Sequence, residues 1–497
     1  MIINNSKNIF IFYSELQNQR FNPETNIQSR IPAFRGIRRY HLKWRRPGRF
    51  LSPEKRKSGM LNKIISHNLR ALTRTIGYNF SAFRIRGIRI YMTGQVFNLL
   101  GDWMQQTAQA WLVWELTHKA TALGVVAFLS QIPYFIFGPW VGSFSDRFDR
   151  RKILLVTQIL AMLLAAMLAY LIQTGKVTLH IVYLLAFLTG TVNAFNSTAE
   201  QAFIGDIAGT GNIKKAIALN NTINQLTRLI GPAIAGWLIV VIGLAPAFWL
   251  NAISILISIL CILMIQYDLK LKKTKGSGLS QFAEALKYFG QQYLLRLIVL
   301  FGAIQAFFGM SIVQLLPAFS SVILKGNAKT LGQLYGAAGA GALVGIVIVL
   351  PFIQKIKRSC MAIGGAVIWA GCWYILFSFC SSLTLAMVCQ FMASLGASNV
   401  LTLSLGLAQE LTPVDMRARI VSTLMMIIYG LQPVASWLVG MSADHFGIHT
   451  TMAINGSLMI ILTAGLLSRP SLNRLISKKP GSEIHEPAVL VPLNKFS

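Results

Sequence analysis

Five polar side chains recur at intervals of three and four inside an otherwise apolar stretch of the chain. They are Gln95, Asn98, Asp102, Gln105 and Gln109. Because an α-helix has 3.6 residues per turn, this spacing places all five on one helical face. A carboxyl group on such a face, held among amides within a membrane, is a candidate for a proton relay. Asp102 is therefore the first residue to which the sequence assigns chemistry.

Two later apolar stretches also carry an ionisable group near amides. The first holds Glu200 with the amides of Asn196 and Gln201, and the second holds Arg228 with the amide of Asn224. Asp102 and Arg228 each lie about 12 residues into their stretches, and an isolated charge at that depth costs at least about 2.5–3.5 kcal/mol. We hypothesise an ion pair between them in which Asp102 exchanges protons; a purely structural ion pair fits equally well. Glu200 lies near the end of its stretch, where solvation also explains it.

The composition places these stretches in a membrane protein. Of the 497 residues, 54% are hydrophobic and 12% are charged, and this charged share is about half that of a soluble globular chain. An ordinary soluble enzyme and a disordered chain are both excluded. From residue 90 the sequence predicts twelve segments that can cross the roughly 30 Å core of a bilayer. We predict them at 90–114, 123–142, 153–173, 181–207, 217–242, 245–265, 295–322, 331–351, 361–380, 383–409, 420–441 and 450–467.

The charges of the loops predict the orientation of these helices. With the N-terminus in the cytoplasm, the cytoplasmic loops hold 17 Lys or Arg residues and the opposite loops hold four. Because Lys and Arg favour the cytoplasmic side, we expect both termini inside and a location in the plasma (inner) membrane. Pro232 and Pro433 lie 201 residues apart, which indicates two repeated halves, a common plan in transporters.

The predicted domains follow from this division. We expect an all-α integral membrane protein with an N-terminal six-helix bundle over 86–265 and a C-terminal six-helix bundle over 295–467. A cytoplasmic loop over 266–294, with a short helix on the membrane surface, joins them. A cytoplasmic tail over 468–497 ends the chain.

The N-terminal segment 1–85 is predicted to be a basic and largely disordered cytoplasmic arm. Residues 1–89 hold 19 Lys or Arg and three acidic residues, about half of the net charge of +30. One interpretation is attraction to anionic lipid or nucleic acid. Others are a tail without a dedicated role, a true start at Met60, and a transit peptide, which is rich in Arg and poor in acidic residues.

The turn after the second predicted helix resembles a known motif. Residues 142–152 read Gly-Ser-Phe-Ser-Asp-Arg-Phe-Asp-Arg-Arg-Lys, similar to the loop 2–3 signature of the major facilitator superfamily, with Asp149 where Gly is usual. The resemblance implies two six-helix halves and a cytoplasmic gate between this loop and the start of the eleventh helix. The gate residues it implies are Gly142, Asp146, Arg147, Arg150, Arg417 and Arg419.

A narrower resemblance is to the enterobactin-exporter and macrolide-efflux-like branch, the transmembrane secretion effector type. The first helix, with Asn-Leu-Leu-Gly-Asp-Trp-Met over 98–104, looks like the opening of that branch. The fifth helix matches at Arg228-Leu-Ile-Gly231-Pro232 and Gly236, where the small residues imply helix packing. The fourth helix departs from it, because Glu200 stands where the branch tends to have Arg.

These features predict a secondary active transporter, specifically a proton-coupled exporter of a siderophore, drug or metabolite that works by alternating access. A lysophospholipid or lipid transporter of the same fold is the alternative. A membrane-tethered nucleic-acid-binding protein is a distant one. We expect no enzyme, because the seven His residues lie in tails, loops or span ends and form no catalytic cluster. We expect no metal, cofactor or nucleic acid, and a monomer that contacts the bilayer, a small-molecule substrate and protons.

Overall fold

The computed structural model describes residues 81–209, 211–265, 287–353, 359–413 and 416–468, which belong to one compact unit, Ser66–Ser497. Every regular element in these ranges is a helix, so the predicted all-α membrane fold is confirmed. After a single turn, η1 (Ser81–Arg84), come six long helices that pack against one another, which we call the N-bundle. They are α3 (Arg86–Thr117), α4 (Ala120–Arg147), α5 (Arg150–Gln173), α6 (Leu179–Ala208), α7 (Ile213–Ile242) and α8 (Leu244–Leu263).

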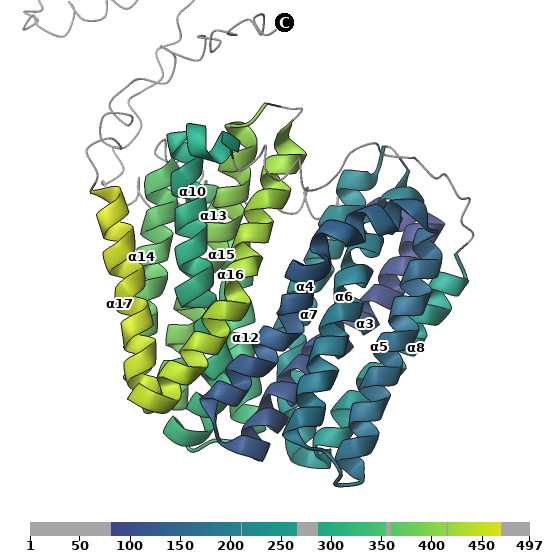
Figure 1. Ribbon diagram of the computed structural model, residues 1–497, viewed down its shortest axis with the longest axis horizontal. Coiled ribbons are helices and arrows are strands. Elements are labelled where there is room, and N and C mark those ends of the chain that lie inside the picture. Colours follow the sequence, from purple (N-terminus) through teal and green to yellow (C-terminus); the bar gives the residue numbers. More distant parts are fainter. Residues whose placement is uncertain (1–80, 210, 266–286, 354–358, 414–415, 469–497) are drawn as a thin grey trace, which may run out of the picture. The chain divides into compact units, whose positions relative to one another are not determined.

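The remaining helices form the C-bundle (Figure 1). Its first span, Tyr293–Ile323, is a run of short helices, and its second, Ala328–Ile353, ends in another such run. These runs are α10 (Tyr293–Ile304), η2 (Gln305–Met310), η3 (Val313–Leu315), α11 (Leu316–Ala318) and η4 (Phe319–Ile323), then α12 (Ala328–Val344), η5 (Gly345–Val349) and α13 (Leu350–Ile353). The rest are α14 (Ser359–Ser378), α15 (Leu383–Glu410), α16 (Arg417–Phe446) and α17 (Ile448–Leu467).

Eleven spans in the described residues are long and apolar enough to cross a membrane. They correspond to the second to twelfth predicted segments, with ends that differ by a few residues. The first predicted segment, 90–114, lies in α3, a 32-residue helix. Its polar stripe makes it less apolar than the others, so the count of twelve crossings stays a prediction.

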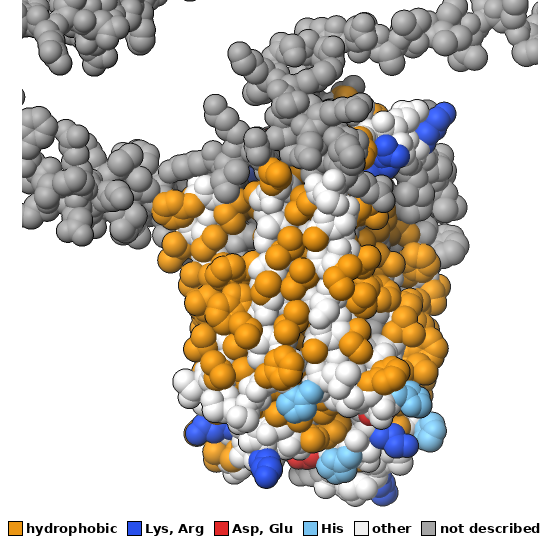
Figure 2. Space-filling view, turned by 90° about the vertical axis from the view of Figure 1, so that its left-hand side faces the viewer, with side chains coloured by type: hydrophobic (Ala, Val, Ile, Leu, Met, Phe, Trp, Pro, Cys, Tyr) orange, Lys and Arg blue, Asp and Glu red, His pale blue; other side chains and the backbone are white. Residues whose placement is uncertain are grey.

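The surface of the protein fits a bilayer. On the face shown in Figure 2, hydrophobic side chains form a broad band, and Lys, Arg and His lie toward the two ends. Phe379 is 74% exposed and Ile461 is 63% exposed. Apolar exposure over such an area is rare on soluble monomers, and in a membrane it faces lipid.

Several predictions of domain limits fall outside the described residues. This holds for the arm except Ser81–Arg84 and the following Ile85, for most of the central loop 266–294, and for the tail except Ser468. These limits therefore stay predictions.

Candidate functional site

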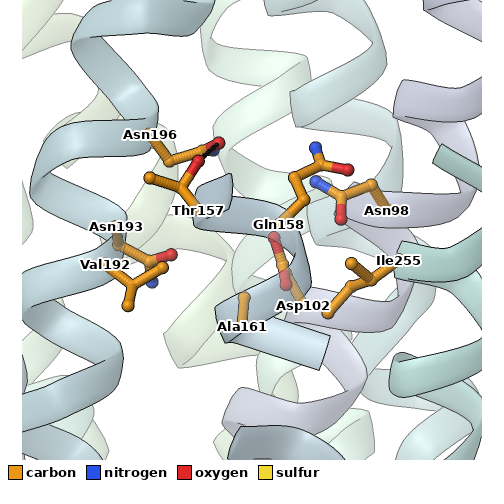
Figure 3. A pocket seen from close by; sticks show the side chains of 9 residues that line it. All are labelled: Asn98, Asp102, Thr157, Gln158, Ala161, Val192, Asn193, Asn196 and Ile255. Carbon is orange, nitrogen blue, oxygen red and sulfur yellow. Dashed lines mark hydrogen bonds between the residues drawn. The ribbon is translucent and has the colours of Figure 1, made fainter. Parts of the chain in front are cut away.

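A polar cavity lies inside the N-bundle, between α3, α5, α6 and α8 (Figure 3). Its volume is about 20 Å³, enough for a water molecule where polar partners are present. It is lined by Asn98, Asp102, Thr157, Gln158, Ala161, Val192, Asn193, Asn196 and Ile255. Three predicted site residues, Asn98, Asp102 and Asn196, thus come together from two helices.

The Asp102 carboxylate is exposed, whereas Asn98, one turn before it, is buried. Asn251 of α8 faces the carboxylate, and its Nδ2 donates a hydrogen bond to Gln105 Oε1 at 2.6 Å. Asn251 is 2% exposed and was missed from the sequence. Its signal was available, since a lone amide in an apolar helix needs a partner inside the protein.

On the side of the cavity opposite Asp102, a hydrogen bond links α5 to α6. Thr157 Oγ1 donates a hydrogen bond to Asn196 Oδ1 at 3.0 Å. Next to it, Gln158 is 3% exposed, and its Oε1 atom has no hydrogen-bond partner in the described structure. This side therefore offers an acceptor toward the cavity that Asp102 also lines.

Glu200 links three helices of the N-bundle. Its Oε1 accepts a hydrogen bond from Gln95 Nε2 of α3 at 2.7 Å and from Asn220 Nδ2 of α7 at 3.0 Å. This carboxylate is therefore held by amides, which corrects the interpretation that it is simply solvated. Among the described contacts, neither the Gln201 nor the Asn224 side chain joins this network.

The hypothesised ion pair between Asp102 and Arg228 is not formed. No carboxylate within the described residues lies within 4.0 Å of the Arg228 guanidinium, which instead lies 5.4 Å from the ring centre of Trp103. Asp102 and Trp103 are successive residues, so their side chains leave α3 about 100° apart. Asp102 faces the N-bundle cavity, while Arg228 lies over Trp103.

Small residues of α7 allow close helix packing. A Cβ added to Gly231 would lie 2.7 Å from Trp103 Cβ, and one added to Gly236 would lie 2.5 Å from Ala328 O in α12. Pro232 lies within α7, and its carbonyl would be 2.5 Å from a Cβ on Gly332. The predicted packing residues thus lie where α7 meets α3 and α12.

The two bundles meet along α4 with α16 and along α7 with α12. The first half of α4 lies against the second half of α16, because a Cβ on Gly440 would lie 2.6 Å from Ala120 O and the Phe128 and Trp437 rings are 6.3 Å apart. We call this contact the outer seam, since it lies at the end where the loops carry few basic residues.

Asp444 fastens the outer seam. Its Oδ1 accepts a hydrogen bond from the Ala120 backbone N–H and its Oδ2 from that of Thr121, both at 2.8 Å. A carboxylate of the C-bundle thus caps the N-terminus of a helix in the N-bundle, where a negative charge is favourable. Asp444 was missed from the sequence. The signal was an acid in the last turn of its own helix, an unfavourable place that indicates a partner elsewhere.

The predicted gate lies at the other ends of these helices. The side chains of Gly142, Asp146 and Arg147, at the end of α4, are outside the described residues. Arg150 Nη1 contacts both Asp206 carboxylate oxygens of α6 at 2.7 Å.

The gate residues at the start of α16, and Asp149 at the start of α5, lie in the described part of the chain and make contacts close by in the sequence. Arg417 Nε donates a hydrogen bond to Thr412 O at 3.1 Å, and Arg419 lies in the first turn of α16. Asp149, which departs from the motif, is the N-cap of α5 and accepts a hydrogen bond from Arg151 N at 3.0 Å. Its φ of −63° requires no glycine.

Two bundles of long apolar helices, one with a polar interior, define a multi-pass membrane protein, and its relatives and fold neighbours are transporters rather than enzymes. A family model described as transmembrane secretion effector matches residues 78–496. The chain belongs to this family of the major facilitator superfamily.

Relatives and solved structures agree with this assignment. The chain is 24% identical over 382 residues to the staphyloferrin A transporter of Staphylococcus aureus, covering 76% of this chain and 94% of that protein. It is 20% identical over 374 residues to macrolide efflux protein A of Streptococcus pyogenes, covering 74% and 92%. A bacterial homologue of the lysosomal transporter Spinster, solved in an inward-facing and occupied conformation, has the same fold. Its TM-score is 0.63 at 13% identity, with 79% of this chain and 97% of that chain covered.

Proposed function

We propose that this protein is a proton-coupled exporter of a small organic molecule and that Asp102 carries the proton. The observation that carries the proposal is the polar cavity of the N-bundle, where an exposed carboxylate lies among amides. No Lys or Arg within the described residues lies within 4.0 Å of that carboxylate. Protonation is then the direct way to neutralise its charge in a membrane.

The surroundings of the two acids favour Asp102 over Glu200 as the proton carrier. Glu200 accepts hydrogen bonds from two amides, and hydrogen bonds to an ionised carboxylate stabilise the charged form. Asp102 lines a cavity that has room for water, so a proton can reach it. We assign proton exchange to Asp102 and the joining of α3, α6 and α7 to Glu200.

The closed outer seam supports a transport cycle by alternating access. Asp444 and the packed glycines hold α4 against α16 at one end. The loop charges predict that this end faces away from the cytoplasm. The structure would then be a state in which substrate loads from the cytoplasm, in an inner-membrane protein whose two termini are both cytoplasmic. Export also suits the kinship to a macrolide efflux protein.

The test uses inside-out membrane vesicles energised with a proton gradient. Uptake is measured for a siderophore, a macrolide, a cationic dye and a lysolipid, each with and without a protonophore. We expect gradient-dependent accumulation of at least one of the first three, and none in vesicles that lack the protein. Accumulation that persists with the protonophore would contradict proton coupling. Accumulation of the lysolipid alone would favour a lipid transporter.

A further inference from the structure

Arg228 lies at the contact between the two bundles. A Cβ added to Gly339 of α12 would lie 2.8 Å from Leu229 Cα and 3.2 Å from Arg228 O. The backbone of α7 therefore touches the C-bundle at the level of Arg228. Further close contacts between α7 and α12 lie at Gly236, toward the C-terminal end of α7.

The surroundings of Arg228 contain aromatic rings instead of acids. Its guanidinium lies 5.4 Å from the centre of the Trp103 ring. Gly231, one turn further along α7, makes room for this ring, because any side chain there would meet Trp103 Cβ. From the C-bundle, Tyr429 of α16 and Tyr374 of α14 lie near the guanidinium.

The hydrogen-bonding groups of this guanidinium are available to a ligand. The contact with the Trp103 ring is a cation–π contact, which uses the charge of the guanidinium and none of its five N–H groups as a hydrogen-bond donor. In the described part of the chain, no acceptor is hydrogen-bonded to these donors and no acid pairs with the charge. Arg228 is only half-buried, and Tyr429 beside it is 45% exposed.

An arginine inside a membrane span without an acidic partner requires an explanation, because inserting a charged side chain into a bilayer is unfavourable. We infer that Arg228, which lies over the Trp103 ring and near Tyr429 of the opposite bundle, binds a carboxylate group of the exported molecule. The planar guanidinium matches a carboxylate through two parallel hydrogen bonds. The exported molecules are therefore organic anions. This inference rests on the proposed export function and names its substrate class.

The position of the site gives the bound anion a second role. Trp103 and Arg228 belong to the N-bundle, whereas Tyr429 belongs to the C-bundle. An anion held between them touches both moving parts. Its binding therefore contributes to the energy difference between the open and closed arrangements of the bundles, as a transport cycle requires.

The test measures binding to the purified full-length protein in detergent. The probes are two fluorescent carboxylates, carboxyfluorescein and pyrenebutyrate, and the cation ethidium, followed by fluorescence anisotropy. We expect the wild type to bind at least one carboxylate. Arg228→Gln should weaken this binding at least about tenfold, since it removes charged hydrogen bonds. Arg228→Lys should weaken this binding less, because lysine keeps the positive charge but lacks the paired N–H donors of the guanidinium.

Two further variants keep the result interpretable. Tyr429→Phe, on the other bundle, should weaken binding by about two- to tenfold through the loss of one hydroxyl. Lys176→Gln removes an exposed cation in the α5–α6 turn and should leave binding unchanged. The inference is overturned if the wild type binds neither carboxylate, or if correctly folded Arg228→Gln and Tyr429→Phe both bind as the wild type does.

These outcomes are separable from those of the proposed function. Binding in detergent needs no proton gradient, so a failure of proton-driven export leaves the binding measurement intact. Conversely, gradient-driven accumulation of ethidium without binding of either carboxylate would support export and overturn the inference.

Discussion

Asp444→Asn is the sharpest perturbation of the outer seam. The native carboxylate accepts one backbone N–H on each oxygen, from Ala120 and Thr121, at 2.8 Å each. Asparagine keeps a single carbonyl oxygen and no charge, so one N–H at the start of α4 loses its acceptor. A hydrogen bond to a charged group contributes about 1.5–3 kcal/mol. Because 1.4 kcal/mol corresponds to a factor of ten, the open fraction of the seam should rise about ten- to a hundredfold.

The assay is the rate of thiol modification at Ser436→Cys in a background without the five native cysteines. Ser436 is completely buried in the seam, where its backbone contacts Gly124. A membrane-impermeant thiol reagent added from outside reacts only while the seam is open. The rate therefore follows the open population when opening and closing are fast.

The control for this assay is Glu115→Gln. Glu115 is an exposed acid near the C-terminal end of α3, the end that leads into α4. It accepts a hydrogen bond from Trp111 of its own helix. Its removal should leave the rate unchanged. The reasoning is refuted if Asp444→Asn and Asp444→Ala both react at the wild-type rate, because the carboxylate would then not hold the seam.

Two stability predictions concern other hydrogen bonds. Glu200→Ala leaves the side-chain amides of Gln95, which is buried, and Asn220, which is half-buried, without their acceptor, at a cost of about 1–3 kcal/mol. It should lower the melting temperature more than Glu200→Gln does; equal melting temperatures would contradict the role of Glu200 in joining α3, α6 and α7. Asp149→Ala removes the N-cap of α5 and should cost about 0.5–2 kcal/mol, whereas Asp149→Ser should retain most of the stability. An Asp149→Ala protein that melts with the wild type would show that the cap is dispensable.

The helices could be predicted from the sequence because length and apolar composition are local properties. The spans from α4 to α17 were found within a few residues. The polar stripe of α3 was predicted by spacing alone, and its members do meet polar partners in α6 and α8.

The pairing of the polar residues could not be predicted in the same way. Asp102 and Arg228 were placed at one depth, but depth does not give the direction in which a side chain leaves its helix. Asp102 and Trp103 are neighbours in α3, yet Asp102 faces the cavity and Trp103 faces Arg228. Asp444 was missed because its partner is a helix N-terminus 324 positions away along the chain; an acid in the last turn of a helix indicates a partner elsewhere but does not say which one.

The central claim is that Asp102 couples export to protons, and one comparison tests it most directly. Wild type and Asp102→Asn are reconstituted in proteoliposomes, and both uphill transport driven by a proton gradient and substrate exchange without a gradient are measured for one exported compound. Asparagine cannot carry a proton, so the variant should lose uphill transport while exchange between the two sides continues. Uphill transport by Asp102→Asn at the wild-type rate would contradict the account.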